Sequence, residues 1–374
     1  MKKRILFVVN HAGFFLSHRL PIAEAAIAAG YDVHVATPKS KHVPQIIAAG
    51  LTWHPIRLAR SAMNPVREIQ TFGDLLRLYK MLAPALVHHV TSKPVLYGTV
   101  AARITGVPAV VNAISGTGHA FVEAGVGRRI GRAFLGLAYR ISQRHPHMRA
   151  IFQNREQLSE FTARGWVRAG DASLIPGSGV DLDRFKPAMR QRSVPVVTLA
   201  SRMLISKGVC EFVDAARMLR SRNVAARFRL VGEPDPDNPG SLSEGRLRML
   251  AADGVVEYCG RSEDMPSVFA ETDVFCLPTY YGEGVPKVLV EAAACGLPCV
   301  TTDWPGCRDV VVNGETGILV PARNAQQVAE ALERLIADPD LRRRMGALAA
   351  VRASQFSLSM VVTRTLALYR ELLQ

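Results

Sequence analysis

Short apolar segments alternate with segments of helical pattern along this chain, and the alternation occurs twice. In the first half the apolar segments are 4–9, 32–38, 86–90, 108–114 and 150–154, and the helical ones are 20–30, 95–106 and 127–144. In the second half the apolar segments are 195–201, 226–232, 255–260, 273–278, 298–303 and 317–321, with helical pattern from residue 208 and over 242–254. Strands that alternate with helices predict α/β layers built on parallel sheets.

A stretch dense in Gly and Pro, residues 175–195, separates the two series and is typical of a linker. A chain of 374 residues is also too long for one ordinary core. We therefore expect two doubly wound, Rossmann-like domains that join near residue 187. Ligands of such sheets bind beyond the carboxyl ends of the strands, so a cleft that the two domains face is the expected site.

The composition is that of a globular protein, with 48% apolar and 21% charged residues. No apolar run approaches the roughly 18 residues that span a bilayer. The apolar stretch Ile5–Val9 is also too short for a signal peptide, so we expect a cytoplasmic protein. The six cysteines form no C-x-x-C pair, and we expect reduced thiols without a chemical role.

The excess of positive charge is confined to one half of the chain. Residues 1–186 carry 24 Lys and Arg against 10 Asp and Glu, whereas residues 187–374 carry 22 of each, so the whole net charge of +14 lies in the first half. Such segregation predicts a surface that faces an anionic partner: a membrane leaflet, a nucleic acid or a phosphorylated substrate.

The segment Tyr280–Pro298, "YYGEGVPKVLVEAAACGLP", places two glutamates around a predicted helix start. Pro286 suits the first helical position, which needs no N–H, and Gly296 marks the end. Glu283 then precedes the helix, and Glu291 lies about 7 Å further along it. Backbone N–H groups at such a start, together with the helix dipole, attract an anion.

Two glutamates at this spacing have several interpretations. They can be a general acid and base, a metal site, or hydrogen-bond acceptors at the two ends of a ligand; the ordinary alternative is a helix cap and a solvated carboxylate. Arg202 and Lys207 lie between a predicted strand and a helix that begins at Gly208, and both cations could reach a diphosphate at the other helix start. The layout of acceptor, phosphate cradle and acceptor matches a sugar nucleotide.

Most of the chain resembles the GT-B glycosyltransferases of family 4, a retaining group that includes many bacterial envelope-polysaccharide enzymes. The matching stretches are "VVNHAGFFLSHRLPIAEAAIAAGYDVHVATP", "IPGSGVDLDRF", "SRMLISKG", "GEGVPKVLVEAAACGLPCVTTDWPGCRDVVVNGETGILVP" and "FSLSMVVTRTLALYRELL". Within the family the chain is most similar to enzymes that extend undecaprenyl-diphosphate-linked sugars, such as N-acetylgalactosaminyltransferases.

The resemblance implies roles for individual residues. Arg202 and Lys207 would hold the donor diphosphate and support the leaving phosphate as its charge grows. Glu283 would accept hydrogen bonds from the donor hexose, and Glu291 from the ribose. Further donor contacts are implied for Gly260 and Arg261 beside the base, and for Gly284, Val285, Pro286 and Lys287 at the helix start.

The resemblance also divides the chain by role: residues 1–186 would bind the acceptor, residues 187–356 the nucleotide sugar, and a final helix, 357–374, would cross back onto the first domain. Gly13, followed by Phe14, falls in the predicted first strand-to-helix loop, where a small residue lets an acceptor approach the backbone.

A histidine of the family motif is missing from its usual position. Many relatives have His-Gly where this chain has Ser115 and Gly116, and that histidine contacts the transferred sugar. His119, three residues later, could take the role, or it is an ordinary loop histidine. We count all three residues as candidate acceptor contacts.

No metal or cofactor is expected. Two Asp-x-Asp patterns occur, Asp181–Asp183 and Asp235–Asp237, but both fall in turn-like sequence. Enzymes of the resembled fold work without a bound metal, because cationic side chains and a helix dipole take its place. The nucleotide sugar is then a substrate.

The helical segment 127–144 is a candidate for the anionic surface. Arg128, Arg132, Arg140 and Arg144 recur at multiples of four with apolar residues between them. Such a helix suits anionic lipid headgroups, although an ordinary solvated helix has the same pattern. We expect peripheral association with the inner face of the cytoplasmic membrane.

The sequence thus predicts a retaining glycosyltransferase that moves a hexose or N-acetylhexosamine from a nucleotide diphosphate, with UDP favoured, to a lipid-linked sugar. A soluble acceptor is one alternative. A sugar-nucleotide 2-epimerase is another, because such isomerases share the architecture. A nucleic-acid-binding protein is disfavoured, since the chain has no zinc-finger spacing and no basic-aromatic repeat.

Overall fold

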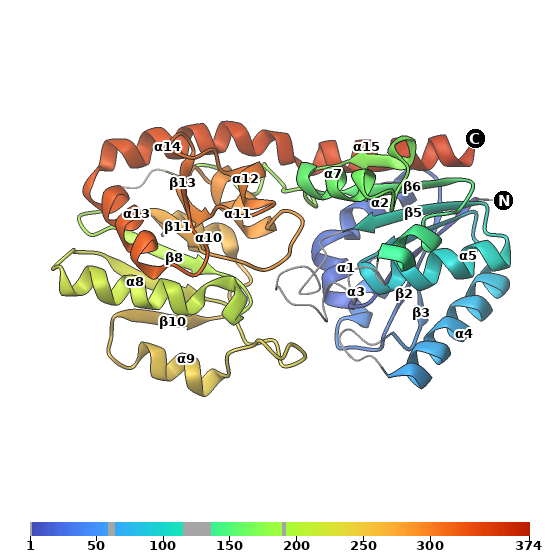
Figure 1. Cartoon of the computed structure of the whole chain (residues 1–374), viewed down its shortest axis with the longest axis horizontal. Coiled ribbons are helices and arrows are strands. Elements are labelled where there is room, and N and C mark those ends of the chain that lie inside the picture. Colours follow the sequence, from blue (N-terminus) through green and yellow to red (C-terminus); the bar gives the residue numbers. More distant parts are fainter. Residues whose placement is uncertain (1, 59–63, 115–135, 189–191) are drawn as a thin grey trace. The chain divides into compact units, whose positions relative to one another are not determined.

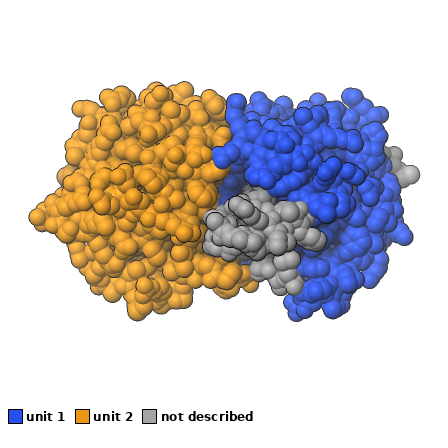
Figure 2. Space-filling model, in the orientation of Figure 1, with its two compact units in different colours: residues 1–179, 282–284, 358–374 blue, residues 180–281, 285–357 orange. Residues whose placement is uncertain are grey.

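The computed structural model describes residues 2–58, 64–114, 136–188 and 192–374. It contains two compact units (Figure 2): unit 1 comprises residues 1–179, 282–284 and 358–374, and unit 2 comprises residues 180–281 and 285–357. Each unit is built on one parallel sheet with helices (Figure 1). The predicted α/β class with two doubly wound sheets is confirmed.

The sheet of unit 1 has the strand order β3-β2-β1-β4-β5-β6-β7, and every neighbouring pair is parallel. The strands are β1 (Arg4–Val9), β2 (Asp32–Thr37), β3 (Thr52–Pro55), β4 (Leu86–Val90), β5 (Ala109–Ile114), β6 (Met148–Phe152) and β7 (Ala172–Leu174). The order reverses between β1 and β4: the strands after β1 are added on one side of it up to β3, and those from β4 onward on its other side. In such sheets this switch point is where ligands bind.

Two hydrophobic clusters cover the two faces of this sheet. Leu6 and Val8 of β1 belong to one cluster, and Ile5, Phe7 and Val9 belong to the other, because alternate side chains of a strand point to opposite faces. The helices are α1 (Ala12–His18), α2 (Leu20–Ala28), α3 (Val43–Ala48), α4 (Pro65–Leu82), α5 (Thr99–Thr105), α7 (Arg155–Ala163) and α15 (Leu358–Leu373). A π-helical turn, η1 (Pro94–Gly98), precedes α5.

The last helix of the chain, α15, packs in unit 1 against α2 and the β1 face of the sheet. Its Tyr369 is fully buried, and the Tyr369 hydroxyl lies 2.5 Å from Nδ1 of His88 in β4. Arg19, also buried, is close enough to interact electrostatically with both groups. Burial lowers the pKa of Arg19 to about 10, and burial lowers the pKa of His88 well below its usual value. Polar as well as apolar contacts therefore hold α15 in unit 1.

The sheet of unit 2 has the strand order β10-β9-β8-β11-β12-β13, again all parallel. The strands are β8 (Val196–Ala200), β9 (Arg227–Val231), β10 (Val256–Gly260), β11 (Val274–Leu277), β12 (Cys299–Thr302) and β13 (Gly317–Val320). Val274 and Cys276 of β11 pack into one cluster, and Phe275 and Leu277 into the other. The order reverses between β8 and β11.

Unit 2 contributes the helices α8 (Val209–Ser221), α9 (Glu244–Ala251), α10 (Met265–Ala270), α11 (Lys287–Ala294), α12 (Cys307–Val310), α13 (Ala325–Ala337) and α14 (Pro339–Ala353). Several begin at a polar side chain that accepts a free backbone N–H, as Ser243 does for α9, Asn324 for α13 and Asp338 for α14. All six cysteines are free thiols, as the sequence predicted. Among the described helices, none combines the length and apolarity needed to cross a membrane.

Candidate functional site

The switch point of unit 2 collects charged and aromatic residues that lie far apart in the sequence. β8 leads into Arg202 and Lys207, and β11 leads into Tyr280 and Tyr281. Because β8 and β11 are parallel neighbours, the segments that follow them leave the same edge of the sheet. The two segments are joined directly: Tyr280 N donates to Ser206 O over 2.9 Å.

Arg202 is fixed by an acidic residue from the next loop. Its Nη1 lies 2.5 Å from Asp235 Oδ2. Asp235 is itself buried, and its backbone N–H donates to Oγ of Ser241 over 2.8 Å. The Asp235–Asp237 pattern therefore supplies an ion-pair partner to Arg202. The pairing leaves the guanidinium about one-third exposed, with a fixed orientation.

Lys207 lies in a single 3-10 turn, Ile205–Lys207, and is buried. The next residue, Gly208, has φ +77°, and a Cβ there would lie 2.3 Å from Pro278 O. Only glycine allows this close approach of the two segments. Helix α8 then begins at Val209, one residue after the position that the sequence predicted, because left-handed Gly208 is its N-cap.

The two cations converge on one aromatic ring. Nζ of Lys207 lies 5.5 Å from the ring centroid of Tyr281, and Cζ of Arg202 lies 5.9 Å from it. The structure therefore brings together Arg202, Lys207 and the turn that leads to α11. A pair of cations in this arrangement can compensate the charge of a diphosphate. The sequence analysis missed Tyr281, because no spacing rule connects it to residue 202.

Arg323, which follows β13, contacts the same turn. Its guanidinium lies 4.7 Å from the ring centroid of Tyr280, within cation–π range. Arg323 has the unusual φ of +58°, and half-buried Glu211 of α8 is close enough to interact with it electrostatically. The sequence analysis missed Arg323 too, since it follows β13 more than forty residues after Tyr280.

Helix α11 begins at Lys287, with Pro286 as its N-cap and without a side-chain cap. The prediction that Pro286 is the first helical residue was therefore wrong by one position, because its ψ of +112° is extended. Val285 and Pro286 are buried. Gly296, with φ +71°, ends the helix as predicted. The proline at the N-cap provides no side-chain cap, and the dipole of the helix favours an anion at this end.

Glu291 is held inside unit 2. Its side chain is 12% exposed, and its carboxylate lies 3.7 Å from Nζ of Lys287, one turn earlier. Burial raises the pKa of Glu291, while Lys287 and Arg184 act in the opposite direction. The carboxylate of Glu291 is therefore not solvated. Lys287 and Arg184 offset only part of the effect of burial on its pKa.

Replacement of Glu291 by Gln is expected to stabilise the protein at pH 7. The raised pKa means that the folded protein binds the proton more tightly than the unfolded chain, so ionisation of Glu291 costs stability above pH 4.5. The glutamine variant avoids this cost, and its advantage in melting temperature narrows as the pH falls toward 4.5. Thermal unfolding of both proteins from pH 5 to 8 measures this difference in melting temperature. A difference that grows as the pH falls would contradict a raised pKa for Glu291.

The backbone at Gly284 is enclosed by unit 1 residues. Asn154 Nδ2 donates to Gly284 O over 2.9 Å, and a Cβ on Gly284 would lie 2.1 Å from Oε1 of Gln153 and 2.8 Å from its Cβ. Residue 284 must therefore be glycine. Glu283, the preceding residue, is half-buried.

Gly260 is the last residue of β10, the edge strand of the unit 2 sheet, and Arg261 follows it. Gly260 has φ +68° and accepts a 2.7 Å hydrogen bond from Gly232 N, while Arg261 pairs with Glu233 over 2.8 Å. A cavity of about 460 Å³ opens beside Gly260, with Tyr258 in its wall. Both predicted residues therefore lie at the carboxyl edge, where β9 and β10 end.

Gly13 and Phe14 lie at the switch point of unit 1, but not in a loop. The prediction of a loop was wrong: α1 begins at Ala12, because the ring of His11 accepts the N–H of Phe14 and caps the first turn. A Cβ on Gly13 would lie 3.0–3.1 Å from the rings of His11 and His42. The glycine makes room for two imidazoles at this edge, and the sequence analysis named neither histidine.

Thr91, directly after β4, is a second feature of the unit 1 switch point. Its φ is +75°, a strained conformation for a β-branched residue, and its hydroxyl is buried without a partner among the described residues. Strain of this kind collects at ligand sites. No pattern in the sequence announces it.

Two substitutions test whether the backbone at Thr91 is strained. Thr91→Ala and Thr91→Gly both remove the hydroxyl, but only glycine accepts φ +75° without strain. We expect the glycine variant to be about 1 kcal/mol more stable than the alanine variant in chemical denaturation. Equal stability would show that Thr91 is not strained.

Some predicted residues cannot be placed. Ser115, Gly116 and His119 lie outside the described residues, as do Arg128 and Arg132. Residues 136–142 are helical, with Arg140 exposed and Tyr139 buried. In the other Asp-x-Asp pattern, Asp181 accepts the N–H groups of residues 183 and 184, which is turn chemistry.

Comparison with known proteins identifies the family. Residues 4–143 match the sequence profile of the glycosyl transferase 4-like family, and residues 194–338 match that of glycosyl transferases group 1. This chain is a glycosyltransferase of the GT-B fold. The enzyme is 28% identical, over 96% of its chain and 97% of the relative, to N,N'-diacetylbacillosaminyl-diphospho-undecaprenol alpha-1,3-N-acetylgalactosaminyltransferase of Campylobacter jejuni.

Two further similarities are informative. The enzyme is 27% identical, over 72% of each chain, to UDP-Gal:alpha-D-GlcNAc-diphosphoundecaprenol alpha-1,3-galactosyltransferase of Escherichia coli. Its fold matches the crystal structure of Anabaena Alr3699/HepE in complex with UDP, with a TM-score of 0.77 at 17% identity over 99% of this chain and 100% of the other.

Proposed function

We propose that this glycosyltransferase moves a hexose or N-acetylhexosamine from a UDP-sugar to a sugar carried on undecaprenyl diphosphate, with retention of the anomeric configuration and without a metal ion. Residues 187–356 would bind the donor, and residues 1–186 would bind the acceptor. The enzyme would work on the inner face of the cytoplasmic membrane as a peripheral protein.

The convergence of Arg202 and Lys207 on Tyr281 carries the proposal. It places two cations at the β8–β11 switch point, beside the turn that leads to the uncapped start of α11. A diphosphate fits this combination, because side-chain cations and backbone N–H groups both favour it. As the bond from the sugar to the phosphate breaks, negative charge grows on the leaving phosphate, and the same groups stabilise it.

The two glutamates would then bind the ends of the donor. Buried Glu291, which is only partly compensated by Lys287, can accept hydrogen bonds from the ribose hydroxyls. Glu283 would accept hydrogen bonds from the hexose and orient it. Neither carboxylate is assigned as a nucleophile, so retention implies transfer on one face of the sugar, with the leaving phosphate taking the acceptor proton.

The acceptor assignment has separate support. The relatives in Campylobacter jejuni and Escherichia coli are both named for undecaprenol-diphosphate-linked sugars. The net charge of +14 in residues 1–186 favours an anionic acceptor or surface. The histidines and strained Thr91 at the unit 1 switch point are where such an acceptor sugar would bind.

A sugar-nucleotide epimerase of the same architecture and a transferase with a soluble acceptor are the competing functions. The matches to glycosyltransferase profiles over residues 4–143 and 194–338 disfavour the epimerase. Incubation with a UDP-sugar alone distinguishes an epimerase from a transferase, since only an epimerase converts the donor to its epimer without an acceptor.

A thermal-shift screen of nucleotide sugars tests the donor proposal. A ligand that binds only the folded protein raises stability by about 2.7 kcal/mol at a concentration of 100 Kd. We expect UDP and UDP-sugars to raise the melting temperature more than ADP- or GDP-sugars do. Stabilisation by another base alone would overturn the UDP assignment, and no stabilisation by any would overturn the donor site.

A further inference from the structure

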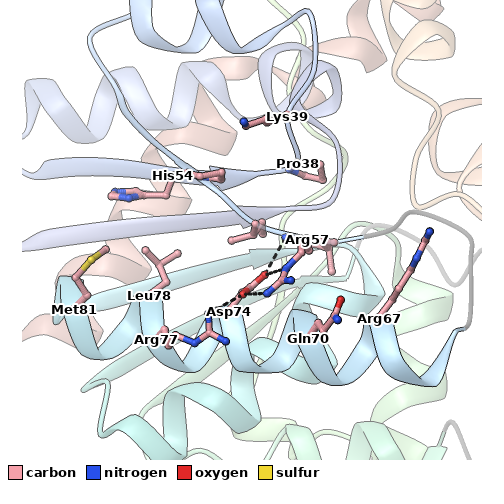
Figure 3. Close-up of a pocket in the computed structure, with 13 residues that line it drawn as sticks. Pro38, Lys39, His54, Arg57, Arg67, Gln70, Asp74, Arg77, Leu78 and Met81 are labelled. Carbon is pink, nitrogen blue, oxygen red and sulfur yellow. Dashed lines mark hydrogen bonds and ion pairs between the residues drawn. The ribbon is translucent and has the colours of Figure 1, made fainter.

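A groove of about 910 Å³ opens in unit 1, beside α4 (Figure 3). One wall is α4, and the other is the chain that follows β2 and β3. We call it the α4 groove and define it by Lys39, Arg57, Arg67, Arg77, Leu78 and Met81. None of these residues was singled out from the sequence.

The groove is elongated along the helix. Arg67, Gln70, Asp74, Arg77 and Met81 recur every three or four residues, so they form one stripe. At 1.5 Å per residue the stripe is about 21 Å long. A ligand that fills it must be extended, with polar groups along part of its length.

Positive charge predominates in the α4 groove. Its described lining residues include four cations, Lys39, Arg57, Arg67 and Arg77, and one carboxylate, Asp74. Asp74 is bound by Arg57 through two hydrogen bonds of 2.7 and 2.8 Å, and Arg77 approaches it at 3.5 Å. His54 adds no charge near neutral pH, because burial lowers its pKa. The excess of cations predicts an anionic ligand.

Apolar side chains lie next to these cations. Leu58 and Leu78 are buried in the groove, while Met81 at its end is 71% exposed. On the adjoining turns of α4, Val66 and Ile69 are 63% and 73% exposed. Large apolar residues exposed on a helix beside arginines are typical of a surface that enters the headgroup layer of a bilayer.

We infer that the α4 groove binds an anionic lipid of the membrane, with its phosphate at the cations that line the groove and its hydrocarbon chain along Leu78 and Met81. This inference deepens the proposed function, because it rests on an acceptor that is carried in a membrane. A nucleic acid fits less well, since His54 is the one aromatic ring among the described lining residues. A soluble phosphate would not need the exposed Val66, Ile69 and Met81.

Co-sedimentation of the full chain with vesicles tests the inference. The wild type is expected to bind phosphatidylglycerol vesicles and not phosphatidylcholine vesicles. Arg67→Glu/Arg77→Glu should weaken binding to phosphatidylglycerol about tenfold or more, since each basic residue near an anionic surface contributes roughly 1 kcal/mol. Ile69→Ser/Met81→Ser should weaken it without changing the charge.

Two matched variants serve as controls. Arg343→Glu/Arg344→Glu makes the same charge change on exposed residues of α14 in unit 2 and should leave binding unaltered. Arg140→Glu/Arg144→Glu tests the helical segment 127–144 as the rival surface. Unchanged binding by the α4 variant, or release by the Arg140/Arg144 variant alone, would overturn the inference.

Further arms separate the lipid from other ligands and from the donor site. If inorganic phosphate stabilises the wild type but not the α4 variant, and vesicles do not bind, the ligand is a free phosphate and the lipid inference fails. The α4 variant should keep the thermal shift produced by UDP. If the wild type binds phosphatidylglycerol vesicles selectively but no nucleotide raises its melting temperature, the donor proposal is wrong and the lipid inference is supported. If nucleotides raise the melting temperature but vesicles do not bind, only the lipid inference is wrong.

Discussion

Replacement of Lys207 by methionine is expected to lower the rate of sugar transfer about 10³-fold, because it removes one of the two cations assigned to the leaving diphosphate. Lys207 is 5% exposed, and its ammonium lies against the ring of Tyr281. Methionine fills similar space without the cost of a buried charge, so the melting temperature should not fall. Single-turnover transfer with saturating donor, together with thermal unfolding, measures both effects.

Two further variants show whether charge or packing matters at residue 207. Lys207→Arg keeps the charge and should retain more transfer than the methionine variant. Lys207→Ala should lose as much transfer as methionine and also some stability, because it leaves a cavity beside Tyr281. Near-normal transfer by the methionine variant would remove Lys207 from the site.

The second large effect is expected for Glu283→Gln, which should lower transfer about 10²-fold or more while UDP binding stays unchanged. The proposed partner of Glu283 is the hexose, which UDP lacks, and a neutral amide accepts hydrogen bonds less strongly than a carboxylate. Calorimetric titration with UDP and with a UDP-sugar distinguishes the two parts of the donor.

Glu291→Gln is the matched control for this experiment. The same chemical change eight residues later should weaken binding of UDP itself, since the proposed partner of Glu291 is the ribose. If Glu283→Gln weakens UDP and Glu291→Gln does not, the two assignments are reversed. If neither variant changes binding or transfer, the glutamates are structural.

The fold was predictable because it follows from local sequence. Each unit repeats a short apolar strand and an amphipathic helix, and alternate residues such as Leu6 and Phe7 face opposite clusters. These patterns need no knowledge of distant contacts. The end of α11 at Gly296 was predictable for the same reason, and helix starts at Ala12, Lys287 and Val209 were missed by a residue or more because caps depend on backbone angles.

The proposed donor site was predictable only in part. Arg202, Lys207, Glu283 and Glu291 stand in motifs, so the sequence identifies them. Tyr281 shows its contact with both cations only when β8 and β11 are neighbours in the sheet.

The unit 1 features depend on contacts that no short pattern encodes. Thr91 is ordinary in sequence and unusual only in its φ of +75°. The α4 groove needs the stripe of α4 and the chain after β2 and β3 in one place. Both depend on tertiary contacts, which local sequence does not determine.

The most direct measurement of the central claim follows a labelled sugar from its UDP-linked donor in the presence and absence of an undecaprenyl-diphosphate-linked sugar. We predict that label enters the lipid fraction only when this acceptor is present, that the new linkage keeps the donor's anomeric configuration, and that Lys207→Met lowers the rate of transfer about 10³-fold. Conversion of the donor to an epimer without any acceptor, or an inverted linkage, would contradict the account.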